Sequence, residues 1–218
     1  MQIKGCLFDL DGVIVDTAKY HYIAWKALAN ELGFDFTEQD NERLKGVSRM
    51  ASLEILLEIG GKTLDEPTKL QMATKKNDNY CEFINQMLPD EIMPGAKELL
   101  IDLRKNGVKV ALGSASKNAL TILNRLELTD LFDAIIDGNK VANAKPDPEV
   151  FLKGAEALGI KPSDCIVFED AEAGVKAALA GGMKAVGIGS PEVLSEAHVV
   201  VAGLHEVSLA QLKSAFEK

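Results

Sequence analysis

Short apolar runs recur along the chain, and each has the length of a strand that is buried on both faces. Between them, apolar residues repeat at helical spacing, as Leu99, Leu100 and Leu103 do before the stop at Asn106 and Gly107. Strands that alternate with helices are typical of a parallel sheet with helices on both faces. The pattern therefore predicts an α/β fold with a Rossmann-like parallel sheet. The predicted strands lie at residues 4–8, 108–112, 134–136, 166–168 and 185–188.

One long segment breaks this alternation, because residues 16–83 show helical patterns and no candidate strand. Trp25, Leu28 and Leu32, for example, share one face of a predicted helix. Proline and glycine mark a linker near residues 89–95. We therefore expect an all-helical cap domain inserted after the first strand. The predicted bounds are residues 1–15 and 88–218 for the core domain and 16–87 for the cap domain.

The composition is that of a folded globular protein. Of the 218 residues, 47% are hydrophobic and 26% are charged, which suits one core domain with a smaller insertion. The apolar run before Asp9 is too short for a signal peptide, and no run approaches the roughly 20 apolar residues of a membrane span. We expect a cytoplasmic protein that has no membrane partner and is a monomer.

The net charge of −9 argues against a general nucleic-acid binder, which needs a basic surface. An anionic ligand must therefore be met locally, by metal ions or by a few lysines and arginines. The cysteines, Cys6, Cys81 and Cys165, are odd in number and widely spaced, so they predict neither a disulfide framework nor a zinc site.

Reactive side chains follow the predicted strands. In open parallel sheets, ligands bind outside the carboxyl ends of the strands, so these positions define a candidate site. The chemistry that suits them is phosphoryl transfer to the Asp9 carboxylate, with a lysine and a magnesium ion supplying positive charge. Asp11, two residues later, can serve as general acid and base. The residues are Asp9, Asp11 and Gly12, then Ser114 and Ser116, then Lys145, and finally Glu169 and Asp170.

Each element also has a purely structural explanation. Asp-x-Asp-Gly is a common turn, Ser114, Ser116 and Asp170 are suitable helix N-caps, and Lys145 with the proline after it can form a rigid exposed turn. An EF-hand loop is excluded because Val13 occupies the third ligand position. The functional interpretation rests on all four groups falling at the same end of one predicted sheet.

Four ordered segments resemble the motifs of the haloacid dehalogenase superfamily, and the helical insertion is similar to its cap. The segments are residues 8–13, 113–118, 145–146 and 168–170. The resemblance implies that Asp9 is the nucleophile and Asp11 the acid and base, while Ser114 and Lys145 hold the phosphoryl group. It also implies magnesium ligands, which are Asp9, the Asp11 carbonyl and Asp170, with Glu169 close by.

Within that superfamily, the cap segments resemble those of the β-phosphoglucomutases. The resemblance adds Thr17 and His21 to the catalytic residues, and it implies a second anion site that uses Arg49. Lys45 and Arg49 could instead be an exposed pair on a helix, and His21 could be a core or surface histidine. The implied substrate-binding residues are Lys45, Gly46, Val47, Arg49, Lys76, Ser116, Lys117 and Asn118.

That family interconverts β-glucose 1-phosphate and glucose 6-phosphate, with an aspartyl-phosphate and β-glucose 1,6-bisphosphate as primer and intermediate. The resemblance therefore implies sugar phosphates as ligands, a cap that closes through hinges near residues 15–17 and 84–94, and a role for His21 and Lys76 in making Asp11 respond to sugar. The alternatives are a sugar-phosphate phosphatase with the same core, a non-enzymatic phosphosugar sensor and a haloalkanoate dehalogenase. The intact nucleophile disfavours the sensor, and the acidic pair 169–170 disfavours the dehalogenase.

Overall fold

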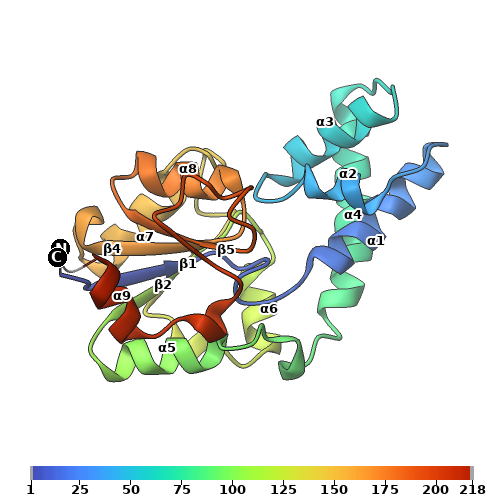
Figure 1. The fold of residues 1–218 in the computed structure, drawn as a ribbon. Helices are drawn as coiled ribbons and strands as arrows, with labels where there is room; N and C mark the ends of the chain where they lie inside the picture. Colours follow the sequence, from blue (N-terminus) through green and yellow to red (C-terminus); the bar gives the residue numbers. More distant parts are fainter. Residues whose placement is uncertain (1, 217–218) are drawn as a thin grey trace.

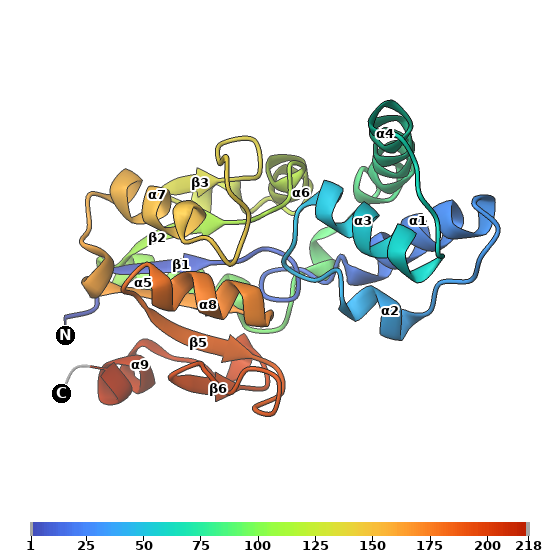
Figure 2. The same ribbon diagram turned by 90° about the horizontal axis from the view of Figure 1, so that it is seen from above.

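A computed structural model describes residues 2–216 and contains a six-stranded parallel sheet with the order β3-β2-β1-β4-β5-β6 (Figures 1 and 2). The five predicted strands are all present, and the α/β prediction is confirmed. Strand β6 was not predicted, because three partly exposed valines at a sheet edge lack the length of a buried run. The strands are β1 (Gly5–Phe8), β2 (Lys109–Gly113), β3 (Ala134–Ile136), β4 (Cys165–Glu169), β5 (Lys184–Ile188) and β6 (Val199–Val201).

Helices cover both faces of the sheet. Helices α5, α6 and α9 pack on the face that carries Phe8, Leu112 and Phe168, whereas α7 and α8 pack on the face that carries Leu7 and Val167. This two-sided burial explains why the strands are continuously apolar rather than alternating. The core helices are α5 (Ala96–Lys105), α6 (Ala119–Arg125), α7 (Glu149–Leu158), α8 (Glu172–Ala180) and α9 (Leu209–Phe216). Short 3₁₀ helices lie at Pro89–Glu91, Thr129–Leu131, Pro162–Asp164 and Leu204–Glu206.

Four helices lie apart from the sheet, beyond the carboxyl ends of the strands (Figure 1). They have a hydrophobic core of their own, with Trp25, Phe36, Leu53 and Leu56 buried in it. The short helix α2 was not predicted, because its residues are all polar; a capping box between Thr37 and the third helical residue starts it. These helices are α1 (Ala18–Glu31), α2 (Glu38–Glu42), α3 (Arg49–Ile59) and α4 (Glu66–Ile84).

The two crossings between sheet and helices run side by side. Val15, on the outgoing crossing, forms a bridge to Ile92 on the returning one. Glu91 ties the same crossings together, since it accepts a hydrogen bond from the Tyr20 hydroxyl at 2.5 Å and pairs with Lys19 at 2.8 Å. No helix within residues 2–216 is long and apolar enough to cross a membrane.

Candidate active site

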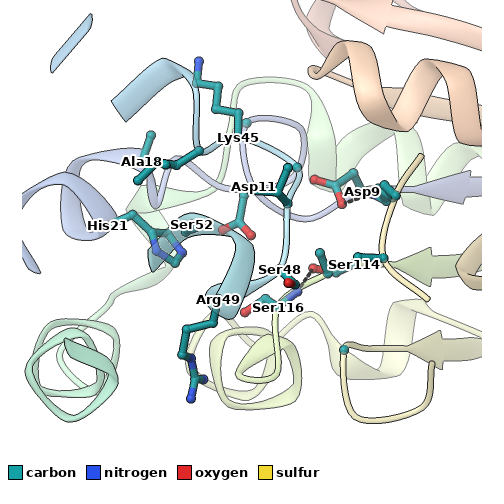
Figure 3. A pocket seen from close by; sticks show the side chains of 18 of the residues that line it. Asp9, Asp11, Ala18, His21, Lys45, Ser48, Arg49, Ser52, Ser114 and Ser116 are labelled. Carbon is teal, nitrogen blue, oxygen red and sulfur yellow. Dashed lines mark hydrogen bonds and ion pairs between the residues drawn. The ribbon is translucent and has the colours of Figure 1, made fainter. Parts of the chain in front are cut away.

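A cavity of about 730 Å³ lies between the carboxyl ends of the strands and helices α1–α4 (Figure 3). The sheet topology brings the predicted core residues together here, and helices α1–α4, called the cap helices below, supply the opposite wall. Two predicted residues, Thr17 and Glu169, are buried behind the wall rather than lining it. The predicted residues that line the cavity are Asp9, Asp11, His21, Lys45, Gly46, Val47, Arg49, Lys76, Ser114, Ser116, Lys117, Asn118, Lys145 and Asp170.

Lys145 organises the core end of the cavity. Its amine lies 2.6 Å from Asp9 Oδ1 and 2.6 Å from Glu169 Oε1, and its side chain is almost fully buried. Burial alone would lower the pKa of Lys145, but the two carboxylates outweigh it and raise that pKa above the usual value. The lysine therefore stays protonated beside the Asp9 carboxylate, so the alternative of an exposed turn is wrong.

Three carboxylates converge beside this lysine. Oxygen atoms of Asp9, Glu169 and Asp170 lie within 4.8 Å of one another, an arrangement of hard oxygen donors that suits a divalent cation such as Mg²⁺. Burial raises the pKa of Glu169 to about 7, and burial followed by the charges of Glu169 and Asp9 raises that of Asp170 well above its usual value, so Lys145 does not fully offset the repulsion among the carboxylates. Gly12, at φ +79°, makes the cluster possible, because a Cβ there would overlap the Asp170 carboxylate.

The Asp11 carboxylate is turned away from that cluster and toward the cap. It accepts a hydrogen bond from the Thr17 hydroxyl at the start of α1. Burial, together with the nearby charge of Asp9, raises the pKa of Asp11 to about 7. A carboxyl group with such a pKa can both donate and accept a proton near neutral pH.

The cap end of the cavity carries a buried amine and an imidazole. Lys76 Nζ lies 2.7 Å from His21 Nδ1 and 4.6 Å from the ring centroids of both Trp25 and Tyr80. Burial and the charge of Arg49 lower the pKa of Lys76 to about 7. Burial, followed by the charge of Lys76, lowers the pKa of His21 well below its usual value, so the imidazole is neutral. His21 is thus a partly buried residue of the cavity wall rather than a surface histidine.

Arg49 and Lys45 do not form a pair on one exposed helix face. Lys45 precedes α3, which begins at Arg49 after the N-cap Ser48, and Lys45 pairs with Glu42 at 2.8 Å. Within residues 2–216, no carboxylate forms an ion pair with the partly buried Arg49 guanidinium. Arg49 therefore brings to the cavity a positive charge that no ion pair within this part of the chain neutralises.

The loop after β2 is held by its own hydroxyl groups. The amide of Ser116 donates to Ser114 Oγ at 3.0 Å, and the amide of Asn118 donates to Ser116 Oγ at 3.2 Å. Helix α6 begins after Asn118 and helix α8 after Ala171, both without a side-chain cap. The prediction of Ser114, Ser116 and Asp170 as possible N-caps is therefore wrong, and these side chains are left to face the cavity.

Some lining residues were not assigned a role from the sequence. Asn41 and Ser52 are buried polar residues on α2 and α3, and Asn77 lies on α4 next to Lys76. Ser52 falls one helical turn after Arg49, so helical spacing from a candidate arginine was an available clue. Asn41 had no such clue, because the short helix that carries it was not predicted.

Comparison with known proteins gives consistent results. Residues 3–182 match the family model described as haloacid dehalogenase-like hydrolase. The β-phosphoglucomutase of Bacillus subtilis is 41% identical over 218 residues, covering 99% of this chain and 96% of that protein. The phosphorylated carbohydrates phosphatase of Thermotoga maritima is 32% identical, covering 84% of each chain.

The crystal structure of a β-phosphoglucomutase from Clostridium difficile superposes with a TM-score of 0.96 at 43% identity, covering 99% of this chain and 98% of that one. The match includes both the sheet and the cap helices, since almost the whole of each chain is aligned. The chain therefore belongs to the haloacid dehalogenase-like hydrolase family and, within it, to the family of the β-phosphoglucomutases.

Proposed function

We propose that this protein interconverts β-D-glucose 1-phosphate and glucose 6-phosphate through phospho-Asp9 and β-glucose 1,6-bisphosphate. The observation that carries the proposal is the placement of charged groups at the two ends of the cavity. Asp9 and Lys145 lie at the core end, whereas Arg49 and Lys76 lie at the cap end, and one cavity connects them. A bisphosphate needs such an arrangement, with a reactive carboxylate for one phosphate and separate positive charge for the other.

The first half-reaction transfers the phosphoryl group from Asp9 to the sugar. The 6-hydroxyl oxygen of β-glucose 1-phosphate attacks the phosphorus, and the bond between phosphorus and the Asp9 oxygen breaks. Asp11 takes the proton of the hydroxyl group, which its pKa of about 7 permits. Lys145, fixed 2.6 Å from the carboxylate, and Ser114 beside it hold the phosphoryl oxygens.

The second half-reaction reverses the roles of the two phosphates. The bisphosphate turns over in the cavity, so that its 1-phosphate faces Asp9 and its 6-phosphate faces Arg49. Asp9 then attacks the phosphorus of the 1-phosphate, the bond to the sugar oxygen breaks, and Asp11 returns its proton to that oxygen. Glucose 6-phosphate leaves, and Asp9 is phosphorylated again.

A metal ion fits the core end of this cavity. Mg²⁺ held by Asp9, Asp170 and the Asp11 carbonyl, with Glu169 nearby, would supply positive charge to the phosphoryl oxygens. The acidic cluster supports this assignment because its charge exceeds that of the single lysine within it. Three carboxylates beside one ammonium group leave a net negative site that a divalent cation completes.

We further propose that residues 16–87 act as a cap domain that closes over bound sugar. The separate hydrophobic core of α1–α4 and the paired crossings at Val15 and Ile92 support a movement of this unit as a whole. Thr17, at the start of α1, holds Asp11 by a hydrogen bond, and His21 lies one turn later. Closure can therefore alter the position of Asp11 when sugar is bound, so that phospho-Asp9 waits for a hydroxyl group rather than for water.

The deciding experiment supplies β-glucose 1-phosphate, Mg²⁺ and a trace of bisphosphate, and follows glucose 6-phosphate and inorganic phosphate together. We expect glucose 6-phosphate from the β-anomer, none from the α-anomer and little free phosphate. Stoichiometric phosphate release would instead show a sugar-phosphate phosphatase. No conversion of either anomer would reject the sugar assignment.

A further inference from the structure

A direct hydrogen bond joins the cap to the phosphate-binding loop of the core. Asn77, on α4, accepts it at Oδ1 from the side-chain Nδ2 of Asn118, at a distance of 2.8 Å. Both residues line the cavity, and neither is fully buried. Asn77 directly follows Lys76, so one turn of α4 contacts both the acid–base side of the cavity and the loop after β2.

The contact fixes the orientation of the Asn118 side-chain amide, with its NH₂ group toward Asn77 and its oxygen toward Cys81. Asn77 Oδ1 can only accept, so it holds the Asn118 NH₂ group, while Cys81 Sγ lies 3.9 Å from Asn118 Oδ1, as a weak donor does. An NH₂ group has two hydrogens, and Asn77 uses one of them. The second remains available for an anion in the cavity.

The orientation of this amide matters because a phosphate dianion can only accept hydrogen bonds. If the Asn118 side chain turned over, a carbonyl oxygen would replace the N–H group, and a donor would become a repulsive acceptor. The loop itself does not prevent this. Ser116 holds only the backbone N–H of Asn118, so the Asn118 side chain stays free to rotate. Within residues 2–216, Asn77 and Cys81 are the side chains that hold it.

The surrounding charge points to an anion at this place. The partly buried Arg49 shares the cavity with Asn118, and the exposed Lys117 precedes Asn118 in the loop. The charge of Arg49 contributes to the lowered pKa of both His21 and Lys76, so the basic groups at the cap end repel one another. An anionic group would relieve this repulsion.

We propose that Asn77 is a positioning residue for the phosphate group that does not react. It acts through Asn118, whose amide it holds with an N–H group toward that phosphate. The inference rests on the proposed function, because only a two-step transfer places a second phosphate at the cap end. A merely structural tie between cap and core would instead affect closure, and hence turnover, whichever ligand was bound.

The test measures binding with the Asp9 end already filled. Mg²⁺ and beryllium fluoride, a mimic of an aspartyl-phosphate, occupy that end, so glucose 6-phosphate must place its phosphate at the cap end. Trp25 is the single tryptophan and lines the cavity, so its fluorescence reports binding. We expect Asn77→Ala to raise the Kd of glucose 6-phosphate by about tenfold, since the released Asn118 side chain can turn its carbonyl oxygen toward the phosphate and lose its hydrogen bond to that charged group.

Asn79→Ala is the matched control, since Asn79 is the same residue type two positions along α4 and, within residues 2–216, it does not line the cavity. We expect this variant to keep the wild-type Kd. In an Asn118→Ala background, Asn77→Ala should add less than about a twofold change, because the residue through which it acts is gone.

Three results would overturn the inference. An equal loss of affinity in both backgrounds would show that Asn77 does not act through Asn118. A lower kcat with unchanged Kd and KM would show a tie that governs closure. No phosphate-dependent binding by the wild type at the filled site would remove the second phosphate site itself. Failure of the proposed function is distinguishable, because it appears as absent glucose 6-phosphate formation while tight binding and its dependence on Asn77 persist.

Discussion

At the scale of single residues, Lys145 and Lys76 show that neighbouring charges decide the pKa of a buried lysine, because burial alone lowers the pKa of both. Lys145 has two carboxylates at 2.6 Å and keeps its proton, whereas Lys76 has a neutral imidazole at 2.7 Å and two aromatic rings. Lys145 therefore keeps its positive charge and can bind phosphoryl oxygens at any pH near neutral. Lys76 can gain or lose its charge near neutral pH, which suits a group that responds to ligand.

The buried charge of Lys76 lowers stability. Because the folded state lowers its pKa from 10.5 to about 7, the unfolded chain binds more protons, and stability rises as pH increases from 7 toward 10.5. We expect Lys76→Met to raise the free energy of unfolding by roughly 1–3 kcal/mol at pH 6–7, with a gain that shrinks toward pH 10. Urea unfolding at several pH values measures this.

The same variant should convert β-glucose 1-phosphate at least about tenfold more slowly, since one of the two cations at the cap end is lost. Lys75→Met is a suitable control, because Lys75 is the neighbouring lysine of α4 and is exposed in a surface pair with Glu31. A pH-independent gain in stability, or a loss of stability at pH 6, would show that Lys76 is protonated at no cost in the folded protein.

At the scale of elements, α8 packs so closely on the end of β4 that only glycine fits at position 174. A Cβ there would overlap the carboxylate of Glu169, which in turn holds Lys145. We expect Gly174→Ala to lower the free energy of unfolding by about 1–3 kcal/mol and to slow phosphorylation of Asp9. Thermal unfolding and phosphoenzyme formation measure the two effects.

Gly182→Ala separates crowding from backbone strain. Gly182 has φ +73°, but no atom lies within 4 Å of the place that a Cβ would occupy, so its substitution should cost about 1 kcal/mol through strain alone. Phosphorylation of Asp9 should then stay at the wild-type rate. If Gly174→Ala behaved in the same way, close packing of α8 would not be what positions Glu169.

The core elements and the core site were predictable from the sequence for a common physical reason. A strand buried on both faces must be apolar throughout, and parallel topology then brings the residues after β1, β2 and β4 to one edge. Helix α2 and strand β6 escaped prediction because a polar capped turn and a short edge strand bury little apolar surface. The cap residues were found through family resemblance, since nothing in local spacing shows that Lys76 meets His21 across 55 positions.

Asn77 and Ser52 escaped prediction for a different reason. Both are small polar residues on helices, where most such side chains face solvent. Their roles depend on how two helices of the cap are placed above the loop after β2, and this placement is decided by packing of Trp25, Leu53 and Leu56 in the cap core. The apolar pattern shows that these residues pack, but the direction in which the opposite helix face points follows only from the assembled structure.

At the scale of the whole molecule, the distribution of charge is more informative than its sum. The chain has a net charge of −9, yet the cap end of its cavity carries the buried Lys76 and Arg49, which forms no ion pair among residues 2–216. The core end has the opposite excess, with three carboxylates around Lys145. An anionic substrate is therefore attracted by the cap, and its approach to the core requires additional positive charge.

That excess leads to a prediction about metal binding and stability. Like charges in the Asp9–Glu169–Asp170 cluster repel one another in a buried site, and a divalent cation reverses the repulsion. Because Mg²⁺ binds these carboxylates only when the fold brings them together, we expect millimolar Mg²⁺ to raise the thermal unfolding midpoint by roughly 2–6 °C. Calorimetry with and without a chelator, at constant ionic strength, measures the shift.

Asp170→Asn should separate the effect of charge repulsion on stability from the effect of Mg²⁺ binding. Without metal, the variant should unfold at a higher temperature than the wild type, because it removes one of the crowded charges and keeps the side-chain shape. With Mg²⁺, it should gain little, because one ligand is lost. Glu82→Gln, on the exposed surface of α4, removes the same formal charge and should change neither value. If Asp170→Asn kept the full response to Mg²⁺, the ion would bind elsewhere. If Asp170→Asn were less stable than the wild type without metal, Lys145 would already balance the charge of the cluster.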